Sequence, residues 1–248
     1  SQYVVRPDAQ QSILQKVNTS LKTYAPKTTQ ITTVIESEKK SMLSVVQQAV
    51  DKGLIEAKGS LSAKDYYNSF VSSAEVLLNK YYSKLIKAAQ TNAVADRREY
   101  ENEVARLKKE TKTEFSIIRL IKNMLWQTQK NAEYTAKLLV SIMLVDTKFL
   151  DNFYYSIAQY RIIQAVTAIK IHNFEKAFIP EILESLVPKY MTELPVDPYS
   201  QQVLKFKKID TRFVIYSTGK DRIDNNGTGN FEKDTQGEDI VLSFAITK

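Results

Sequence analysis

The feature that most constrains this chain is an abrupt change of sequence pattern at Leu194. Before it, apolar residues recur every three or four positions, the period of an amphipathic helix. The stretch from Leu194 to Ile240 is different, because it holds four of the chain's six glycines: Gly219, Gly227, Gly229 and Gly237. We therefore expect long helices followed by a small, turn-rich module.

The first helices are predicted from their start and stop signals. Pro7 begins the first helix and Pro26 ends it. A second runs from about Thr28 to Lys52, with Gly53 as its C-cap. Ser62 is the expected N-cap of a third, long helix.

Two further segments complete the helical part. The charged stretch Arg97–Lys112 interleaves acids and bases, which favours an exposed helix or a coiled-coil arm over a phosphate-binding surface. From Thr113 to Ile169 the apolar pattern returns strongly, and we expect this segment to be the central packing element. It is either one very long helix or two, with a break near Asp146 or Asp151.

Strand patterns follow. Val203–Lys207 and Phe213–Tyr216, on either side of a turn at Lys208–Thr211, are predicted as strands, and Ile240–Ile246 is a third short strand. The predicted fold class is mainly α (α+β): long antiparallel helices, then a small C-terminal antiparallel three-stranded β module. A long acidic and glycine-rich loop, Gly219–Gly237, precedes the last strand.

The predicted domain organisation has two parts. Residues 1–172 form a helical domain, and residues 173–248 form a C-terminal β module packed on the last long helix. Because the module needs that helix to cover it, we expect the two parts to make one compact unit.

The composition removes most catalytic chemistry. The chain has no Cys and one His, His172, so it has no thiol nucleophile, disulfide or Cys/His zinc site. We expect His172 to serve as a cap or a surface residue. We predict no catalytic residue, no organic cofactor and no enzyme activity.

The net charge of +7 lies in the helical part, since the residues from Pro195 onward carry 8 acidic and 8 basic side chains. These basic residues are scattered, as on a solvated surface; weak affinity for an anionic polymer or membrane surface is the alternative. Nucleic acid is not an expected partner. The longest apolar run, Leu138–Val145, is far shorter than the roughly 20 residues of a membrane span. No signal peptide is visible, and an anchor upstream of Ser1 is compatible with the sequence.

The glycine-rich loop is dense in oxygen ligands. Candidate ligands in the loop and just after it are Asp221, Asp224, Asn225, Asn226, Asp234, Glu238 and Asp239. Clustered carboxylates and amides on a flexible loop suit Ca²⁺, which takes six to eight oxygen ligands. The residue types alone leave two interpretations open, a metal site and a solvated acidic turn.

Several short motifs appear in a fixed order through this region. They comprise Leu183, Leu186, Val187, Pro188 and Tyr190; then Leu194, Pro195, Asp197 and Pro198; then Tyr216, Ser217, Gly219 and Asp221; and finally Asp239 and Ile240. In this order they resemble the C-terminal region of type II secretion major pseudopilins, and more closely a group of large uncharacterised bacterial envelope proteins with the same module. The resemblance covers about a third of the chain, from His172 to Phe244.

The resemblance implies a calcium-stabilised loop with Asp221, Asp224, Asp239 and Asn226 as metal ligands. Arg222 departs from the pattern, which usually has Gly there. The resemblance also implies a periplasmic or otherwise extracytoplasmic bacterial location. The long helices before the module replace the apolar N-terminal helix of a pseudopilin, so filament assembly is not implied.

The resulting hypothesis is a non-enzymatic structural or binding protein of the bacterial envelope, with an unknown protein partner. Two alternatives stay open. One is a metal-dependent hydrolase that uses the acidic loop. The other is a basic helical module that binds nucleic acid or an anionic polymer.

Overall fold

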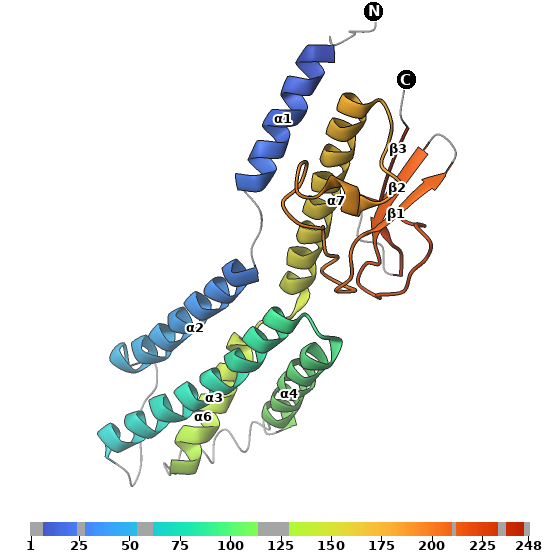
Figure 1. Cartoon of the computed structure of the whole chain (residues 1–248). Helices are drawn as coiled ribbons and strands as arrows, with labels where there is room; N and C mark the ends of the chain where they lie inside the picture. Colours follow the sequence, from blue (N-terminus) through green and yellow to red (C-terminus); the bar gives the residue numbers. More distant parts are fainter. Residues whose placement is uncertain are drawn as a thin grey trace, which may run out of the picture. The chain divides into compact units, whose positions relative to one another are not determined.

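The structure is a computed structural model that describes residues 7–23, 28–53, 62–113, 129–209, 212–232 and 237–245. The chain divides into two compact units (Figure 1). The inserted unit is Lys27–Lys148, and the sheet unit combines Ser1–Pro26 with Phe149–Lys248. The predicted boundary at residue 172 falls inside the sheet unit, because the last long helix belongs with the β module.

The inserted unit is a bundle of helices built around α3. It contains α2 (Thr28–Asp51), α3 (Ala63–Thr91), α4 (Val94–Thr113) and α6 (Gln129–Met143). α3 packs against each of the other three, and α4 also contacts α6. The buried positions of α6 are small or β-branched, which lets the helices approach closely: Ala132, Ala136 and Val140.

Local capping residues set the ends of α3. The Ser62 hydroxyl accepts a hydrogen bond from the Asp65 N–H at 3.1 Å, which confirms Ser62 as the N-cap. At the other end Asn92 adopts a left-handed conformation and donates its N–H to the Ala88 carbonyl. Asn92 and Ala93 form the break between the two helices, and α4 begins at Val94.

α4 is not the exposed arm that its charge suggested. Tyr100, Val104 and Leu107 are buried at helical spacing, and the Tyr100 hydroxyl donates to the Val145 carbonyl at 2.9 Å. The expectation was wrong because charged neighbours masked a narrow apolar stripe. These three residues and the buried Thr111 suffice because the partner helices supply the rest of the core.

The break predicted near Asp146 is confirmed. α6 ends at Met143 and α7 spans Lys148–Lys176. The Asp146 carboxylate accepts a hydrogen bond from the Lys148 N–H at 3.0 Å, which stops one helix and starts the next. Residues 114–128 of the predicted long segment lie outside the described residues.

The sheet unit consists of α1 (Pro7–Thr23), α7, a short 3₁₀ turn (Leu183–Leu186) and the strands β1 (Lys205–Ile209), β2 (Arg212–Ser217) and β3 (Ile240–Ala245). The strands form an antiparallel sheet in the order β1-β2-β3. These elements confirm the predicted fold class. The predicted turn residues Asp210 and Thr211 lie outside the described residues.

α7 is the helix on which this unit is assembled. Its buried residues include Ile162, Ala165 and Ile169, and Lys170 places its amine 5.5 Å from the Phe244 ring of β3. α1 also joins this unit: Tyr160 of α7 donates to the Leu21 carbonyl. No helix in the described ranges is both long and apolar enough to cross a membrane.

Candidate functional site

The connection between β2 and β3, Thr218–Asp239, carries all four predicted metal ligands, and we call it the acidic loop. β2 is buried on both faces from Phe213 to Ser217. The acidic loop covers one of them, since a Cβ added at Gly227 would lie 3.1 Å from Cγ1 of Val214 and 3.3 Å from the Tyr216 ring. The described part of the loop thus packs on the sheet. A fully solvated turn would not make these contacts.

Three residues on one face of α7 contact the acidic loop through an ion pair and two hydrogen bonds. Asp151 forms an ion pair with Lys220 at the start of the loop. Tyr155 and Gln159 both donate to the Phe231 carbonyl, at 2.8 and 2.7 Å. The three α7 residues are spaced by four, so they lie on one helix face and contact the loop at two points.

Asp239 is the buried carboxylate of the loop. It is 1% exposed, and its two oxygens accept hydrogen bonds from the Gly227 N–H at 2.7 Å and the Asn225 N–H at 3.3 Å. Burial raises the pKa of this carboxyl, and the nearby charges of Asp224 and Asp221 act in the same direction, while the two N–H donors oppose them. The Asp239 carboxylate therefore lies where a positive charge would be strongly favourable.

Asp221 lies close enough to Asp239 for its charge to act on the Asp239 carboxyl. Its Oδ1 accepts from the Ile223 N–H at 3.0 Å, and its Oδ2 lies 3.7 Å from the position of a Cβ at Gly237. The next residue, Arg222, has a φ of +63°. This backbone conformation is the one that favours Gly, so the departure from the pseudopilin pattern changes the side chain and keeps a glycine-like turn.

Asp224 and Asn226 face β1 and its lysines. Oδ1 of Asp224 accepts hydrogen bonds from the Tyr216 hydroxyl at 3.0 Å and the Asn226 N–H at 2.9 Å, and its Oδ2 lies 3.9 Å from Nζ of Lys205. Lys207 donates to Oδ1 of Asn226 at 3.0 Å. The Asn226 N–H and then the Tyr216 hydroxyl lower the pKa of Asp224, and burial raises the pKa of Tyr216.

The four predicted ligands are thus divided between two environments. Asp224 and Asn226 have cationic partners on β1, whereas in the described part of the chain no lysine or arginine pairs with Asp221 or Asp239. The Asp, Glu and His side chains of the described ranges form no group of three or more that could hold a metal ion together. The oxygens of Asp221 and Asp239 are hard ligands of the kind that calcium prefers.

Asp197, one of the motif residues of the resemblance, has a structural role that the sequence did not predict. It is 1% exposed and accepts five hydrogen bonds. Two come from its own turn, Tyr199 N–H and Ser200 Oγ, and three from the end of β2, Ser217 Oγ and both donors of Thr218. No local sequence signal connects Asp197 with Ser217 and Thr218, which lie about twenty positions away.

His172 is a packing residue and lies away from the surface. It is 7% exposed, and its Nδ1 lies 3.1 Å from the Phe178 carbonyl oxygen. The edges of the Phe178 and Tyr190 rings pack on it at centroid distances of 5.1 and 5.2 Å. The predicted surface role was wrong because the chain folds back over the end of α7.

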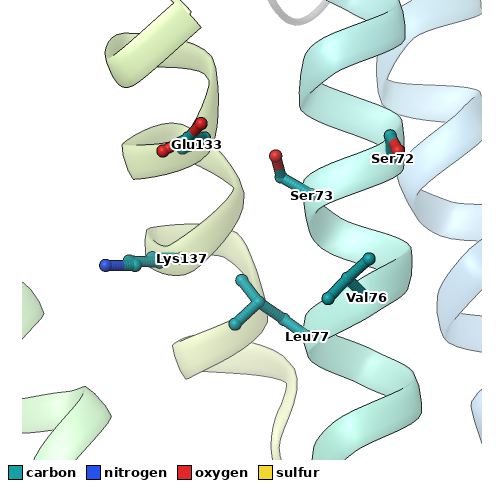
Figure 2. A pocket seen from close by; sticks show the side chains of 6 residues that line it. All are labelled: Ser72, Ser73, Val76, Leu77, Glu133 and Lys137. Carbon is teal, nitrogen blue, oxygen red and sulfur yellow. The ribbon is translucent and has the colours of Figure 1, made fainter.

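The inserted unit has a shallow hollow of about 240 Å³ between α3 and α6 (Figure 2). Its lining residues are Ser72, Ser73, Val76, Leu77, Glu133 and Lys137. Figure 2 shows Ser73 and Leu77 directed toward α6, while the Lys137 amine extends away from α3. The hollow therefore offers mainly apolar surface and hydroxyl groups.

Comparison of the chain with protein-family models, with curated proteins and with solved structures found no match.

Proposed function

We propose that this chain is a non-enzymatic structural or binding protein of the bacterial cell envelope, whose acidic loop is stabilised by calcium. The observation that carries the proposal is the buried Asp239 carboxylate, near the charge of Asp221 and with no lysine or arginine paired to either in the described ranges. A carboxylate removed from water needs several hydrogen bonds or a compensating charge, and the described residues give Asp239 two N–H donors. Calcium would supply that charge, and the resemblance to pseudopilins favours the same ion.

The chain's own residues would do three things in this role. Asp239 and Asp221 would provide the carboxylate oxygens, and Asp224 and Asn226 would serve as weaker contributors from the lysine-bound side. The Gly227 and Asn225 N–H groups orient the Asp239 carboxylate. Closing the loop then covers Val214 and Tyr216 of the sheet.

The extracytoplasmic location and a protein partner are proposed on the resemblance alone. Fractionation of the source bacterium with antiserum against the chain tests the location. We expect the protein in the periplasmic or membrane-associated fraction. Its recovery with cytosolic marker enzymes would refute this part of the proposal.

We do not favour the two alternatives. A hydrolase needs a base with freedom to accept a proton, and His172 is enclosed by aromatic rings while Asp197 is saturated with hydrogen bonds. A polyanion-binding module needs a surplus of unpaired cations. On α3, Lys80, Lys84 and Lys87 instead pair with acids of α4.

Thermal melting with and without calcium tests the metal proposal. We expect added Ca²⁺ to raise Tm and EDTA to reverse the change. At a free concentration of about 100 times Kd, a single site adds about 2.7 kcal/mol to the free energy of unfolding, which corresponds to several degrees. Identical melts in both conditions would refute calcium binding.

Matched variants locate the site. Asp221→Asn removes an exposed carboxylate without disturbing the core, and we expect it to weaken the calcium response several-fold. Asp239→Asn should abolish the response. Glu232→Gln, which removes an exposed acid from the same loop, is the control and should respond like the original chain.

A further inference from the structure

The register of β1 and β2 places two lysines against the acidic loop. Lys205 stands opposite Tyr216 and Lys207 opposite Val214. Directly paired residues of an antiparallel ladder point to the same face, so both lysines lie on the face that the loop covers. Lys208 stands opposite Phe213 and therefore points to the other face.

The two lysines engage the outer part of the loop through three contacts. Nζ of Lys205 lies 3.9 Å from Oδ2 of Asp224, and Nζ of Lys207 donates to Oδ1 of Asn226 at 3.0 Å. The Lys207 amine also lies 5.3 Å from the centre of the Tyr216 ring, whose hydroxyl donates to Asp224. The lysines, the tyrosine and the two loop residues thus form one connected network on the edge strand of the sheet.

This network takes two of the four oxygen-bearing side chains that the resemblance assigns to a metal. A lysine ammonium and a bound cation compete for the same carboxylate, since each favours the charged form and repels the other. Asp221 and Asp239 have no such competitor in the described residues. In the described residues, lysines of β1 therefore contact Asp224 and Asn226, and no lysine or arginine pairs with Asp221 or Asp239.

We propose that Lys205 and Lys207 are an internal counter-cation that holds Asp224 and Asn226 in place of a metal ion. The acidic loop then stays closed over Val214 and Tyr216 when calcium is removed. Calcium, at the site proposed above on which this part of the inference rests, is bound by Asp221 and Asp239 with reduced affinity. The lysines thus keep the acidic loop closed when the metal is lost. They also lower the affinity of the loop for calcium.

The test is hydrogen exchange of the Asn226 amide in the full chain, with EDTA present. This amide donates to Asp224, so its protection reports whether the network is closed. We expect Lys205→Thr combined with Lys207→Thr to raise its exchange rate about fivefold, the effect of losing a partly exposed ion pair and its neighbouring hydrogen bond. Lys208→Thr is the control on the same strand and should leave the rate unchanged.

A second measurement separates this role from plain strand stability. Titration with Ca²⁺ should show several-fold tighter binding in the Lys205→Thr and Lys207→Thr double variant than in Lys208→Thr, because two repelling charges are gone. Equal exchange rates in the double variant and the control would overturn the inference, as would unchanged or weaker calcium binding in the double variant. If the original chain and both variants bind no calcium, the calcium proposal fails, whereas the exchange rates in EDTA still decide the role of the lysines.

Discussion

Asp197 shows how one buried carboxylate can fix the connection between two distant segments. Each of its oxygens has at least two donors, so the charge is compensated by dipoles and hydroxyls in a site with almost no exposure to solvent. Arg161 of α7 is near enough for its charge to interact with Asp197, and it donates to the Val196 carbonyl. The turn before β1, the end of β2 and α7 therefore meet at a single residue.

Replacing this carboxylate should be strongly destabilising. Asp197→Ala leaves the hydroxyls of Ser217 and Thr218 and a backbone N–H buried without an acceptor. We expect a loss of about 3 kcal/mol in the free energy of unfolding, mainly because buried donors are left unsatisfied. Urea denaturation monitored by circular dichroism measures it. The exposed Glu181→Ala is the control, and a loss for Asp197→Ala no larger than that of the control would contradict this role.

The same residues show what the sequence could predict at this scale. The acids of the loop were identified because their types and density are local properties. Their division into a lysine-bound pair and an uncompensated pair depends on the register that brings Lys205 and Lys207 opposite β2. That register is a tertiary property, as are the bonds from Ser217 and Thr218 to Asp197.

Among the elements, the α3–α4 hairpin combines a narrow apolar seam with a row of ion pairs. Lys84 lies 2.9 Å from a Glu103 carboxylate oxygen and also pairs with Glu99, and Lys80 lies 2.8 Å from the other Glu103 oxygen. Lys80 and then Lys84 lower the pKa of Glu103 from its ordinary 4.5. The ionised form of Glu103 is therefore favoured by folding.

A pH dependence follows from this shift. Because the folded pKa of Glu103 is below its unfolded value, its stabilising effect is complete above about pH 4.5 and is lost as the pH falls through the lower, folded pKa. Glu103→Gln should reduce the free energy of unfolding by less than about 1 kcal/mol at pH 7, because the pair is partly exposed. The difference from the original chain should be smaller at pH 3 than at pH 7, because protonation of Glu103 removes the effect. Urea titrations at both pH values measure it, and a difference that persists undiminished at low pH would contradict the argument.

The boundaries of the elements were more predictable than their packing. Ser62 and the break at Asp146 were found because caps act on neighbouring backbone groups. The burial of Tyr100 in α4 was missed, since it depends on α3 and α6. The strands were placed within two residues because turn residues and the glycine-rich loop separate short runs rich in strand-forming residues.

At the level of the whole molecule, the inserted unit is one continuous segment, and the sheet unit is made of the two segments that come before and after it in the sequence. α1 belongs with α7 and the sheet through the Tyr160 bond to Leu21 and the Asn18 bond to the Tyr190 carbonyl at 3.3 Å. The sequence suggested a simpler division at residue 172, because helical periodicity does not reveal which helices share a core. The segment Lys27–Lys148 has its own buried core, and the chain passes through it in a single continuous stretch.

This arrangement predicts that residues 27–148 fold on their own. The segment keeps α3 together with the helices that pack on it, and Phe70, Leu78 and Tyr82 of α3 are buried. We expect the isolated fragment to be helical and to melt cooperatively. Asp197→Ala in the full chain should then lower only the transition that the fragment does not show, since Asp197 lies in the sheet unit. A fragment without a cooperative transition, or a variant that lowers both transitions equally, would show that the two units fold as one.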